Sequence, residues 1–432
     1  MVSSARLLAF VAHYPEMNFT SQIVALSSAA AFALQIALAL LMLRYFPPEE
    51  VGMFSVISQI GFFWTTLALA QTPLRLLANH GASVFEDARQ AWSSSVQRFV
   101  WLLPVAALTV WWSGLSFVNA LLWALLLSLC QLTWMLAQSM RLRMVVAWAQ
   151  AGVRILPPLM ALLASVAAVS LQWDGPALLT AALLGYAVGA AWLFPALVRT
   201  HQAEFQNASA VSVDPPLLQN TPAFTTLVST PPVSGDNRSA KLRVAHTLVD
   251  AMLATAIVVV WQRAYGAQET GWMAAPLRLM GFVPAVVHMA WAQVLLAQPL
   301  VEHKRVNPMW VGLGGFVCVG LLGASCAFAL AIGWLGENWI GVWSYLLPLV
   351  LWQGSACYVA AHSHIPFKTN KARRYSWLCM GVAGLQIFAL ITPYAIRWDI
   401  TPFMHFMGFS IISLIGFIFI SVCIRNISQQ TI

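Results

Sequence analysis

Long runs of apolar residues, separated by short polar connections, follow one another along the chain. Twelve such runs lie at 21–43, 51–77, 98–114, 117–138, 145–170, 177–198, 244–262, 271–297, 309–333, 338–361, 376–396 and 401–424. Most are close to the ~20 residues that an α-helix needs to cross a hydrocarbon core ~30 Å thick. The pattern therefore predicts an all-α polytopic membrane protein with about 12 transmembrane helices.

One stretch of this pattern occurs twice. Residues 44–78 and 263–297 align without a gap at an offset of 219 positions, which is about half the chain length. Both copies read as a short charged turn followed by a long apolar helix. The aligned identities are Arg44/Arg263, Glu50/Glu269, Gly52/Gly271, Phe63/Phe282 and the triplets Leu76-Leu77-Ala78 and Leu295-Leu296-Ala297. The repeat predicts two structurally similar six-helix lobes.

The polar segments outside these runs define the rest of the domain organisation. Residues 1–20 contain an apolar run too short to span a bilayer, which predicts an interfacial N-terminal segment rather than a cleaved signal peptide. Residues 199–243 are rich in Pro, Thr and Ser and show no helical period, as is typical of a linker. We therefore expect an N-lobe at 21–198, a linker at 199–243 and a C-lobe at 244–432.

The composition points to lipid as the surrounding medium. Hydrophobic residues make up 60% of the 432 residues and charged residues only 8%, which leaves too little polar surface for a soluble globule. The net charge of +8 comes from basic residues spread over short connections, so we expect no nucleic-acid partner. The six cysteines lie in or beside apolar runs and are expected to be packing residues.

The basic residues are sorted between the two sides of the predicted membrane. Sixteen Lys and Arg residues fall on one side, whereas Arg44, Arg263 and Arg397 fall on the other. Because positively charged connections tend to remain in the cytoplasm, this bias predicts that both termini and the 199–243 linker are cytoplasmic.

The sequence holds no recognisable catalytic motif. It contains no HExxH, GxSxG or Walker-type phosphate-binding sequence, and its 14 Asp and Glu residues are scattered. We therefore expect no enzymatic activity, no metal site and no cofactor.

Three arginines lie within apolar runs, where a charge needs a partner or a function. Arg154 is about ten residues, or ~15 Å, into its helix, and Arg278 is about seven residues, or ~10 Å, into its own. Either arginine can line a polar cavity or clamp neighbouring helices through an ion pair or backbone carbonyls. Arg75 lies near the cytoplasmic end of its helix, where it can snorkel to the headgroups or take part in substrate access.

Asp250 is the acidic residue that the pattern places well inside an apolar run. It lies about one and a half turns into the seventh predicted helix, with His246 one turn earlier on the same face. The carboxylate can bind a proton or a sodium ion, or it can neutralise a buried arginine. Both interpretations are open from the sequence.

The two repeat copies resemble a known family. The first copy, with Pro48-Glu49-Glu50-Val51-Gly52 followed by Arg75, is similar to the polysaccharide-transporter branch of the multidrug/oligosaccharidyl-lipid/polysaccharide exporter superfamily, typified by Wzx-type O-antigen flippases. The second copy, with Pro276-Leu277-Arg278-Leu279, resembles the opposite lobe of that family. It departs from the first copy at Ala267-Gln268, which stand in place of Pro48-Glu49.

The resemblance implies a flippase that carries an undecaprenyl-pyrophosphate-linked oligosaccharide, an O-antigen or exopolysaccharide repeat unit, across the bacterial inner membrane. It implies a cationic cleft between the lobes, where Arg154, Arg278 and Arg75 would bind the substrate. It also implies alternating access coupled to proton or sodium antiport, with Asp250 and His246 as the candidate coupling residues. Membrane lipid is an expected partner, and glycan polymerase machinery is open as another.

Two other functions remain open at this point. A drug or metabolite exporter of the same superfamily would exchange a small cation for protons or sodium. Its cavity is expected to be acidic, whereas the buried charges here are mostly arginines. A membrane glycan polymerase or ligase generally needs a large outer loop, and the predicted outer connections are only a few residues long.

The charge bias predicts the orientation of the chain. A reporter enzyme that is active only in the cytoplasm should be active when fused at Asn220, within the predicted linker. A reporter that is active only in the periplasm should be inactive at the same position. Paired cytoplasmic and periplasmic reporters at this one position measure the orientation directly. A periplasmic signal would reverse the predicted topology and the direction of transport with it.

Overall fold

The computed structural model describes residues 19–70, 72–73, 76, 83–144, 147–193, 195, 197–198, 237–292, 307–369 and 371–429. Within these residues the regular structure is helical and contains no β-strand, which confirms the all-α prediction. Most of the predicted N-terminal segment and most of the predicted linker lie outside the described residues.

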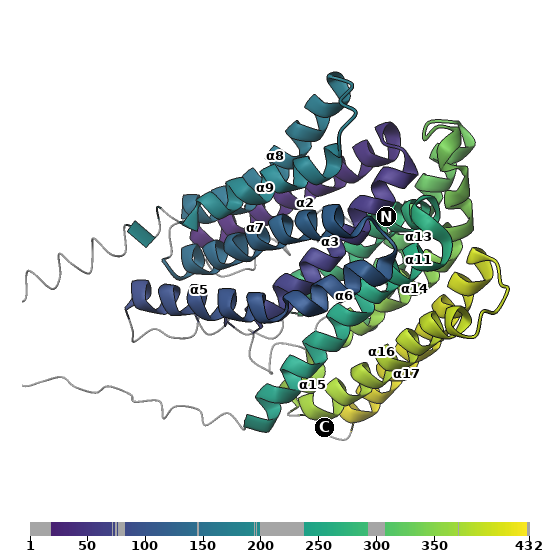
Figure 1. Ribbon diagram of the computed structural model, residues 1–432. Coiled ribbons are helices and arrows are strands. Elements are labelled where there is room, and N and C mark those ends of the chain that lie inside the picture. The colour runs from purple at the N-terminus through teal and green to yellow at the C-terminus, as the bar shows by residue number, and fades with distance from the viewer. Residues whose placement is uncertain are drawn as a thin grey trace, which may run out of the picture. The chain divides into compact units, whose positions relative to one another are not determined.

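The helices follow the predicted apolar runs closely (Figure 1). They are α2 (Phe19–Tyr45), α3 (Pro48–Leu69), α5 (Val84–Trp101), α6 (Leu103–Ser113), α7 (Phe117–Arg143), α8 (Ala147–Ser170), α9 (Ala177–Ala191), α11 (Asn237–Val286), the π-helix η1 (Val287–Ala292), α13 (Pro308–Ala331), the 3₁₀-helix η3 (Glu337–Val342), α14 (Trp343–His362), α15 (Ile365–Lys368), α16 (Ala372–Ala395) and α17 (Pro402–Gln429).

The described residues contain nine helices that are long and apolar enough to cross a membrane. The shorter apolar helices α6 and α9 correspond to the third and sixth predicted spans. Helix α11 covers both the seventh and the eighth, so that counting it twice recovers the twelve predicted spans. The protein is a multi-pass membrane protein.

Helix α11 contains one break, at Gly266. This residue has φ 86° and ψ −178°, a backbone conformation that residues with a Cβ rarely adopt, and the chain continues as a helix on both sides. The expected charged turn of the second repeat copy is therefore a kink within a helix. Gly266 aligns with Pro47 of the first copy, which caps α3 with φ −69°.

The chain forms two compact units. The first comprises residues up to 38, 71–97 and 129–213, and its helices α8 and α9 pack side by side (Figure 1). Its core contains the buried side chains Leu76, Ala88, Ala137, Met140, Val153 and Leu193.

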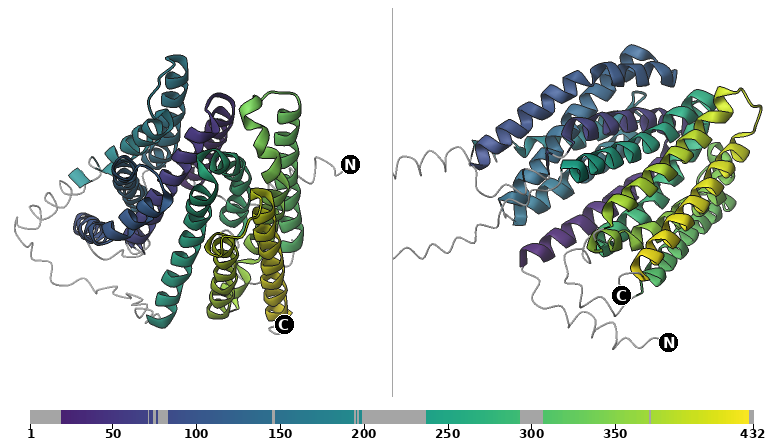
Figure 2. Two further views of the ribbon diagram at one scale, coloured as in Figure 1. Left: turned by 45° about the vertical axis from the view of Figure 1, so that its right-hand side comes forward. Right: turned by 90° about the horizontal axis from the view of Figure 1, so that it is seen from below.

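The second unit comprises residues 39–70, 98–128 and 214–432. Within it, α11 packs against α3, α14 against α13 and α17, and α16 against both α11 and α17. The pairing of α16 with α17 is visible in Figure 2. The boundary between the units passes through α2, α5 and α7 and does not coincide with the predicted lobe boundary, so the two lobes stay a prediction.

The two repeat copies contact each other within the second unit, where α3 crosses α11. A Cβ atom added at Gly52 would overlap the backbone of Ala267 and lie 3.0 Å from the nitrogen of Gly271. A Cβ atom added at Gly271 would overlap the backbone of Pro48. Because Gly52 aligns with Gly271 and Pro48 with Ala267, the contact is reciprocal, as in an isologous interface. Small residues are what lets two membrane helices approach this closely.

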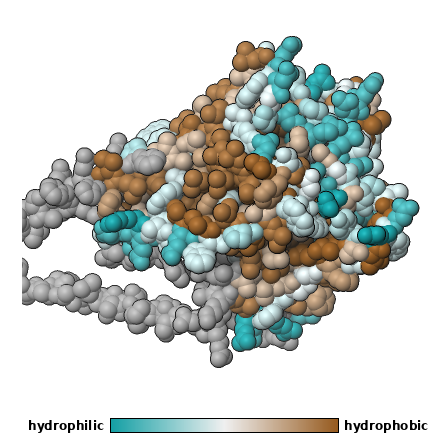
Figure 3. All heavy atoms as spheres, viewed as in Figure 1, coloured by the Kyte–Doolittle hydropathy of each residue, from teal (hydrophilic) through white to brown (hydrophobic). Residues whose placement is uncertain are grey.

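Large hydrophobic side chains cover much of the outer surface of the described helices. Exposed examples include Trp111, Leu122, Phe328, Phe388 and Ile415, each on a membrane-span helix or short apolar helix. The face shown in Figure 3 carries broad hydrophobic areas. Such a surface is stable against lipid tails and not against water.

The reciprocal glycine contact leads to a prediction about stability. Gly52→Ala and Gly271→Ala should each lower the free energy of unfolding by about 1–3 kcal/mol, because the added methyl group meets backbone atoms that cannot move aside. Gly314→Ala is the matched control, since Gly314 lies in α13 and a Cβ added there would meet no atom within 4 Å. Thermal unfolding of the purified variants in detergent measures the effect. Equal melting temperatures for all three variants would contradict the close crossing.

Candidate functional site

Arg278 lies in the second half of α11, next to the crossing with α3. Its Nη2 atom donates a hydrogen bond to Ser58 Oγ at 3.0 Å, and its guanidinium lies 4.4 Å from the ring centre of Phe54. Both contacts come from α3, so the side chain bridges the two repeat copies. Arg278 is twelve residues after the Gly266 kink, or ~18 Å along the helix.

Two arginines at equivalent repeat positions precede the crossing, Arg44 at the end of α2 and Arg263 just before the kink of α11. Arg44 donates to the backbone oxygen of Trp334 and lies 5.6 Å from the centre of its ring. Arg263 donates from Nε to the hydroxyl of Tyr394 at 3.2 Å. Each bond therefore ties a repeat copy to a helix end of the C-terminal half, α13 or α16, on the side that the charge bias predicts to be external.

A carboxylate lies in a cluster of aromatic side chains within the second unit. Glu269 accepts a hydrogen bond from the hydroxyl of Tyr345 on α14, and the Nε1 atom of Trp261 donates to the same hydroxyl at 2.9 Å. Tyr345 and Trp261 are fully buried. The hydroxyl group thus accepts from one neighbour and donates to the other, so that its hydrogen-bonding capacity is used well.

The aromatic cluster continues through Tyr265 to α17. The hydroxyl of Tyr265 lies 2.8 Å from His405 Nδ1, and His405 Nε2 lies 3.0 Å from the backbone oxygen of Leu390. Because a backbone oxygen can only accept, His405 carries its proton on Nε2 when neutral and accepts from Tyr265 at Nδ1. His405 is buried, so this arrangement satisfies both ring nitrogens inside the helix bundle.

Arg154 belongs to the first unit. Its Nη1 atom donates to Ser28 Oγ of α2 at 2.6 Å. Arg154 lies in α8, three residues before Pro157. A basic pair at the end of α7 lies in the same unit, where Arg143 forms an ion pair with Asp87 at 2.7 Å and Arg141 contacts the Trp192 ring at 5.5 Å.

Asp250 and His246 lie in the first half of α11. Their Oδ2 and Nε2 atoms are 3.4 Å apart, as expected for side chains one helical turn apart. His246 also contacts the edge of Tyr375, with ring centres 6.1 Å apart. The Asp250 side chain is 58% exposed, and its ion-pair partner among the described residues is His246 rather than an arginine.

The predicted site residues thus fall into separate groups. Arg278, Asp250 and His246 lie on α11, on opposite sides of the Gly266 kink, whereas Arg154 belongs to the other compact unit. Arg75 lies outside the described residues. The described part of the chain holds no group of three or more His, Cys, Asp or Glu residues placed to bind a metal ion.

The sequence did not predict the aromatic cluster around Glu269. It placed Glu269 in a charged turn, whereas the structure places it on α11 beside buried aromatic residues. The repeat did contain a signal, because Glu269 is aligned with Glu50. No sequence pattern marked Tyr345 or His405 as part of this cluster, because both lie on helices that are distant in the sequence from α11.

Comparisons with known proteins identify the fold. The sequence matches no protein-family model, and no curated protein is significantly similar to it. The structure is similar to that of "Lipid II flippase MurJ, inward closed conformation", with a TM-score of 0.64 and 10% identity over 93% of this chain and 87% of that chain. A multidrug resistance MATE family transporter of the MOP superfamily, in an inward-facing conformation, aligns at a TM-score of 0.47 and 13% identity over 92% of this chain and 94% of that chain. The chain therefore shares the fold of the MurJ structure.

Proposed function

We propose that the protein is a flippase of the bacterial inner membrane. Its substrate is an undecaprenyl-pyrophosphate-linked oligosaccharide, of the O-antigen or exopolysaccharide type, which moves from the cytoplasmic to the outer leaflet without chemical change. The observation that carries the proposal is the presence of arginines well inside membrane-spanning helices in a fold shared with a lipid II flippase. That neighbour shows only that this fold can move a lipid-linked substrate.

The arginines fit an anionic substrate for electrostatic reasons. A pyrophosphate that enters a membrane interior gives up its hydration, and fixed donors must replace the lost water. A guanidinium has five N–H donors in a planar fork that matches phosphate oxygens, so it can bind a phosphate while one N–H remains on a serine hydroxyl. Arg278 and Arg154 each make such a serine contact, which fixes the direction of the side chain.

The kink in α11 lies between Asp250, the candidate coupling residue, and Arg278, the candidate substrate-binding residue. Asp250 lies sixteen residues before Gly266, and Arg278 lies twelve residues after it. A change in the kink angle would move the substrate-binding half of the helix relative to the half that carries the carboxylate. This is a simple means of coupling cation binding to alternating access.

The geometry of Asp250 supports a role in cation coupling. Its exposed carboxylate can take up a proton or a sodium ion, and the His246 ring on the preceding turn lies within reach of it. The alternative role, neutralising a buried arginine, has less support because the ion pair observed is with His246.

Replacing the arginines tests the proposed substrate site. Arg154→Ala and Arg278→Ala should each lower export of the lipid-linked oligosaccharide by roughly tenfold or more, since removing one partner of a desolvated charge pair costs about 2–5 kcal/mol. The Lys variants should retain part of the activity, because the charge remains and the planar fork does not. Export is measured in membrane vesicles, normalised to the amount of folded protein.

Arg373→Ala is the matched control for these variants, because Arg373 is an exposed arginine at the start of α16. It should export at the wild-type rate. A purely structural role for Arg154 and Arg278 would lower thermal stability and membrane abundance in step with activity. Full export by both Ala variants at normal abundance would refute the cationic site.

Replacing the carboxylates of α11 tests the coupling site. Asp250→Asn keeps the shape and removes the charge, so transport should lose its dependence on pH or on sodium. Glu269→Gln should keep that dependence and lower thermal stability instead, because Glu269 accepts a hydrogen bond inside the aromatic cluster. The readout is the initial transport rate across a series of pH values and sodium concentrations. The reverse pattern would assign coupling to Glu269 and overturn the role of Asp250.

A further inference from the structure

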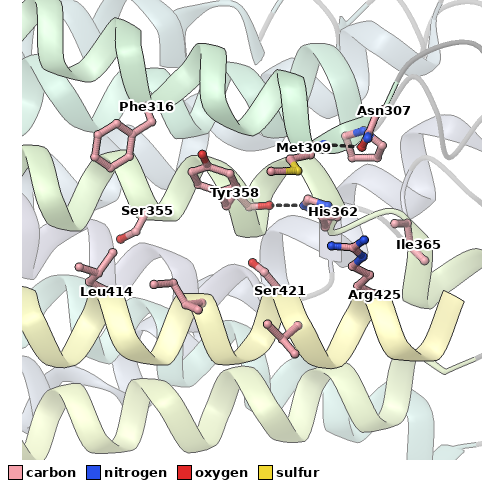
Figure 4. Close-up of a pocket in the computed structure, with 13 residues that line it drawn as sticks. Asn307, Met309, Phe316, Ser355, Tyr358, His362, Ile365, Leu414, Ser421 and Arg425 are labelled. Carbon is pink, nitrogen blue, oxygen red and sulfur yellow. Dashed lines mark hydrogen bonds between the residues drawn. The ribbon is translucent and has the colours of Figure 1, made fainter. Parts of the chain in front are cut away.

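A pocket of about 580 Å³ lies between α13, α14 and α17 in the second unit (Figure 4). It is separate from Arg278, the aromatic cluster and Asp250, none of which line it. One end of the pocket is polar and carries Asn307, His362 and Arg425. The other end is mainly apolar, with Phe316 and Leu414.

The polar end has donors that point to an anion. Arg425 is exposed and makes no hydrogen bond or ion pair with any residue that the structure describes. Figure 4 shows its guanidinium beside His362, whose Nδ1 atom is bonded to the backbone oxygen of Tyr358 at 2.8 Å. Asn307 uses its side-chain oxygen to cap α13, accepting from the Met309 nitrogen at 3.0 Å, so its amide nitrogen remains as a donor.

These three residues also lie at the ends of their membrane-span helices. Arg425 is one residue from the end of the span Pro402–Asn426, and Asn307 directly precedes the span Pro308–Ala331. Lys304 and Arg305 precede Asn307 in the sequence, and the charge bias predicts that this side is cytoplasmic. The polar end of the pocket is therefore expected at the level of the lipid headgroups.

The length of the pocket fits one leaflet. Leu414 and Arg425 both line it and are eleven residues apart on α17, or ~16 Å along the helix axis. Half of a hydrocarbon core ~30 Å thick is ~15 Å. The apolar side chains Ile418 and Val422 line the pocket between these two residues and are about half exposed, so an acyl chain can lie against them.

We propose that this pocket binds an anionic phospholipid of the cytoplasmic leaflet. The headgroup phosphate is held by Arg425, with the amide nitrogen of Asn307 as an additional donor, and one acyl chain lies along α17 between α13 and α14. Basic pockets between membrane helices on the cytoplasmic side are suited to anionic headgroups, where each Lys or Arg contributes a favourable electrostatic term. The site is distinct from the proposed transport pathway and does not depend on the transported substrate.

Lipid binding to the purified full-length protein tests this proposal. The protein in detergent is titrated with phosphatidylglycerol or with phosphatidylcholine of the same acyl chains, and bound lipid is counted by native mass spectrometry. Wild-type protein should retain phosphatidylglycerol in preference to phosphatidylcholine. Arg425→Gln should weaken phosphatidylglycerol binding roughly fivefold, the effect of about one basic residue near an anionic lipid.

Two further variants separate the site from general surface charge. Arg374→Gln removes an exposed basic residue that does not line the pocket, and it should bind phosphatidylglycerol as the wild type does. Ile418→Trp fills the apolar part without a change of charge, and it should also weaken phosphatidylglycerol binding. This variant tests the pocket even if Arg425→Gln folds poorly.

Three results would overturn the lipid site. The first is equal retention of the two lipids by the wild type. The second is unchanged phosphatidylglycerol binding in both Arg425→Gln and Ile418→Trp. The third is full competition by inorganic phosphate, which would indicate a site for the free anion. None of these readouts involves transport, so a failed lipid site leaves the proposed flippase activity intact.

Discussion

The close contact of α3 with α11 at Gly52 and Gly271 determines the arrangement of the second unit. Each glycine meets the backbone of the other repeat copy, so the two helices cross at a distance that no larger side chain permits. Arg278 lies seven residues after Gly271 and Ser58 six residues after Gly52, about two turns beyond the crossing on both helices. The hydrogen bond between them therefore depends on the glycine contact.

The direction of these contacts is also informative. Pro48 and Gly52 meet residues 267–271, and Ser58 farther along α3 meets Arg278 farther along α11. The two copies therefore run in the same direction through the crossing, as in parallel repeats related by an axis along the membrane normal. Inverted repeats would bring the end of one copy to the start of the other.

The sequence predicted the spans well because the bilayer imposes a length and a polarity on every helix that crosses it. It also identified the repeat, through residues such as Gly52 and Gly271 that later meet in space. It did not predict the continuity of α11, because a single glycine with positive φ can redirect a helix without any polar loop. The hydropathy pattern shows only that the apolar run is interrupted, and a kink and a turn interrupt it in the same way.

The side-chain contacts could not be predicted from the sequence, for a different reason. Arg263 and Tyr394 are 131 positions apart, and Trp261 and Tyr345 are 84 apart. Such pairs depend on which helices become neighbours and on the rotation of each about its axis, and neither property is encoded in local hydropathy. Depth alone could identify Arg154 and Arg278 as unusual. Their partners are serines, which are abundant in the chain and carry no signal as single residues.

Polar groups on both sides of Gly266 hold the kink of α11 in place. Trp261 before Gly266 and Glu269 after it both hydrogen-bond to the hydroxyl of Tyr345, which holds both sides of the kink against α14 inside a buried cluster. Arg263 and Tyr265, also before Gly266, are bonded to Tyr394 and His405. Asp250, about four turns earlier, has His246 of its own helix as its partner. A change of angle at Gly266 therefore requires these bonds to shift together, whereas the contact of Arg278 with Ser58 keeps the following turns in register with α3.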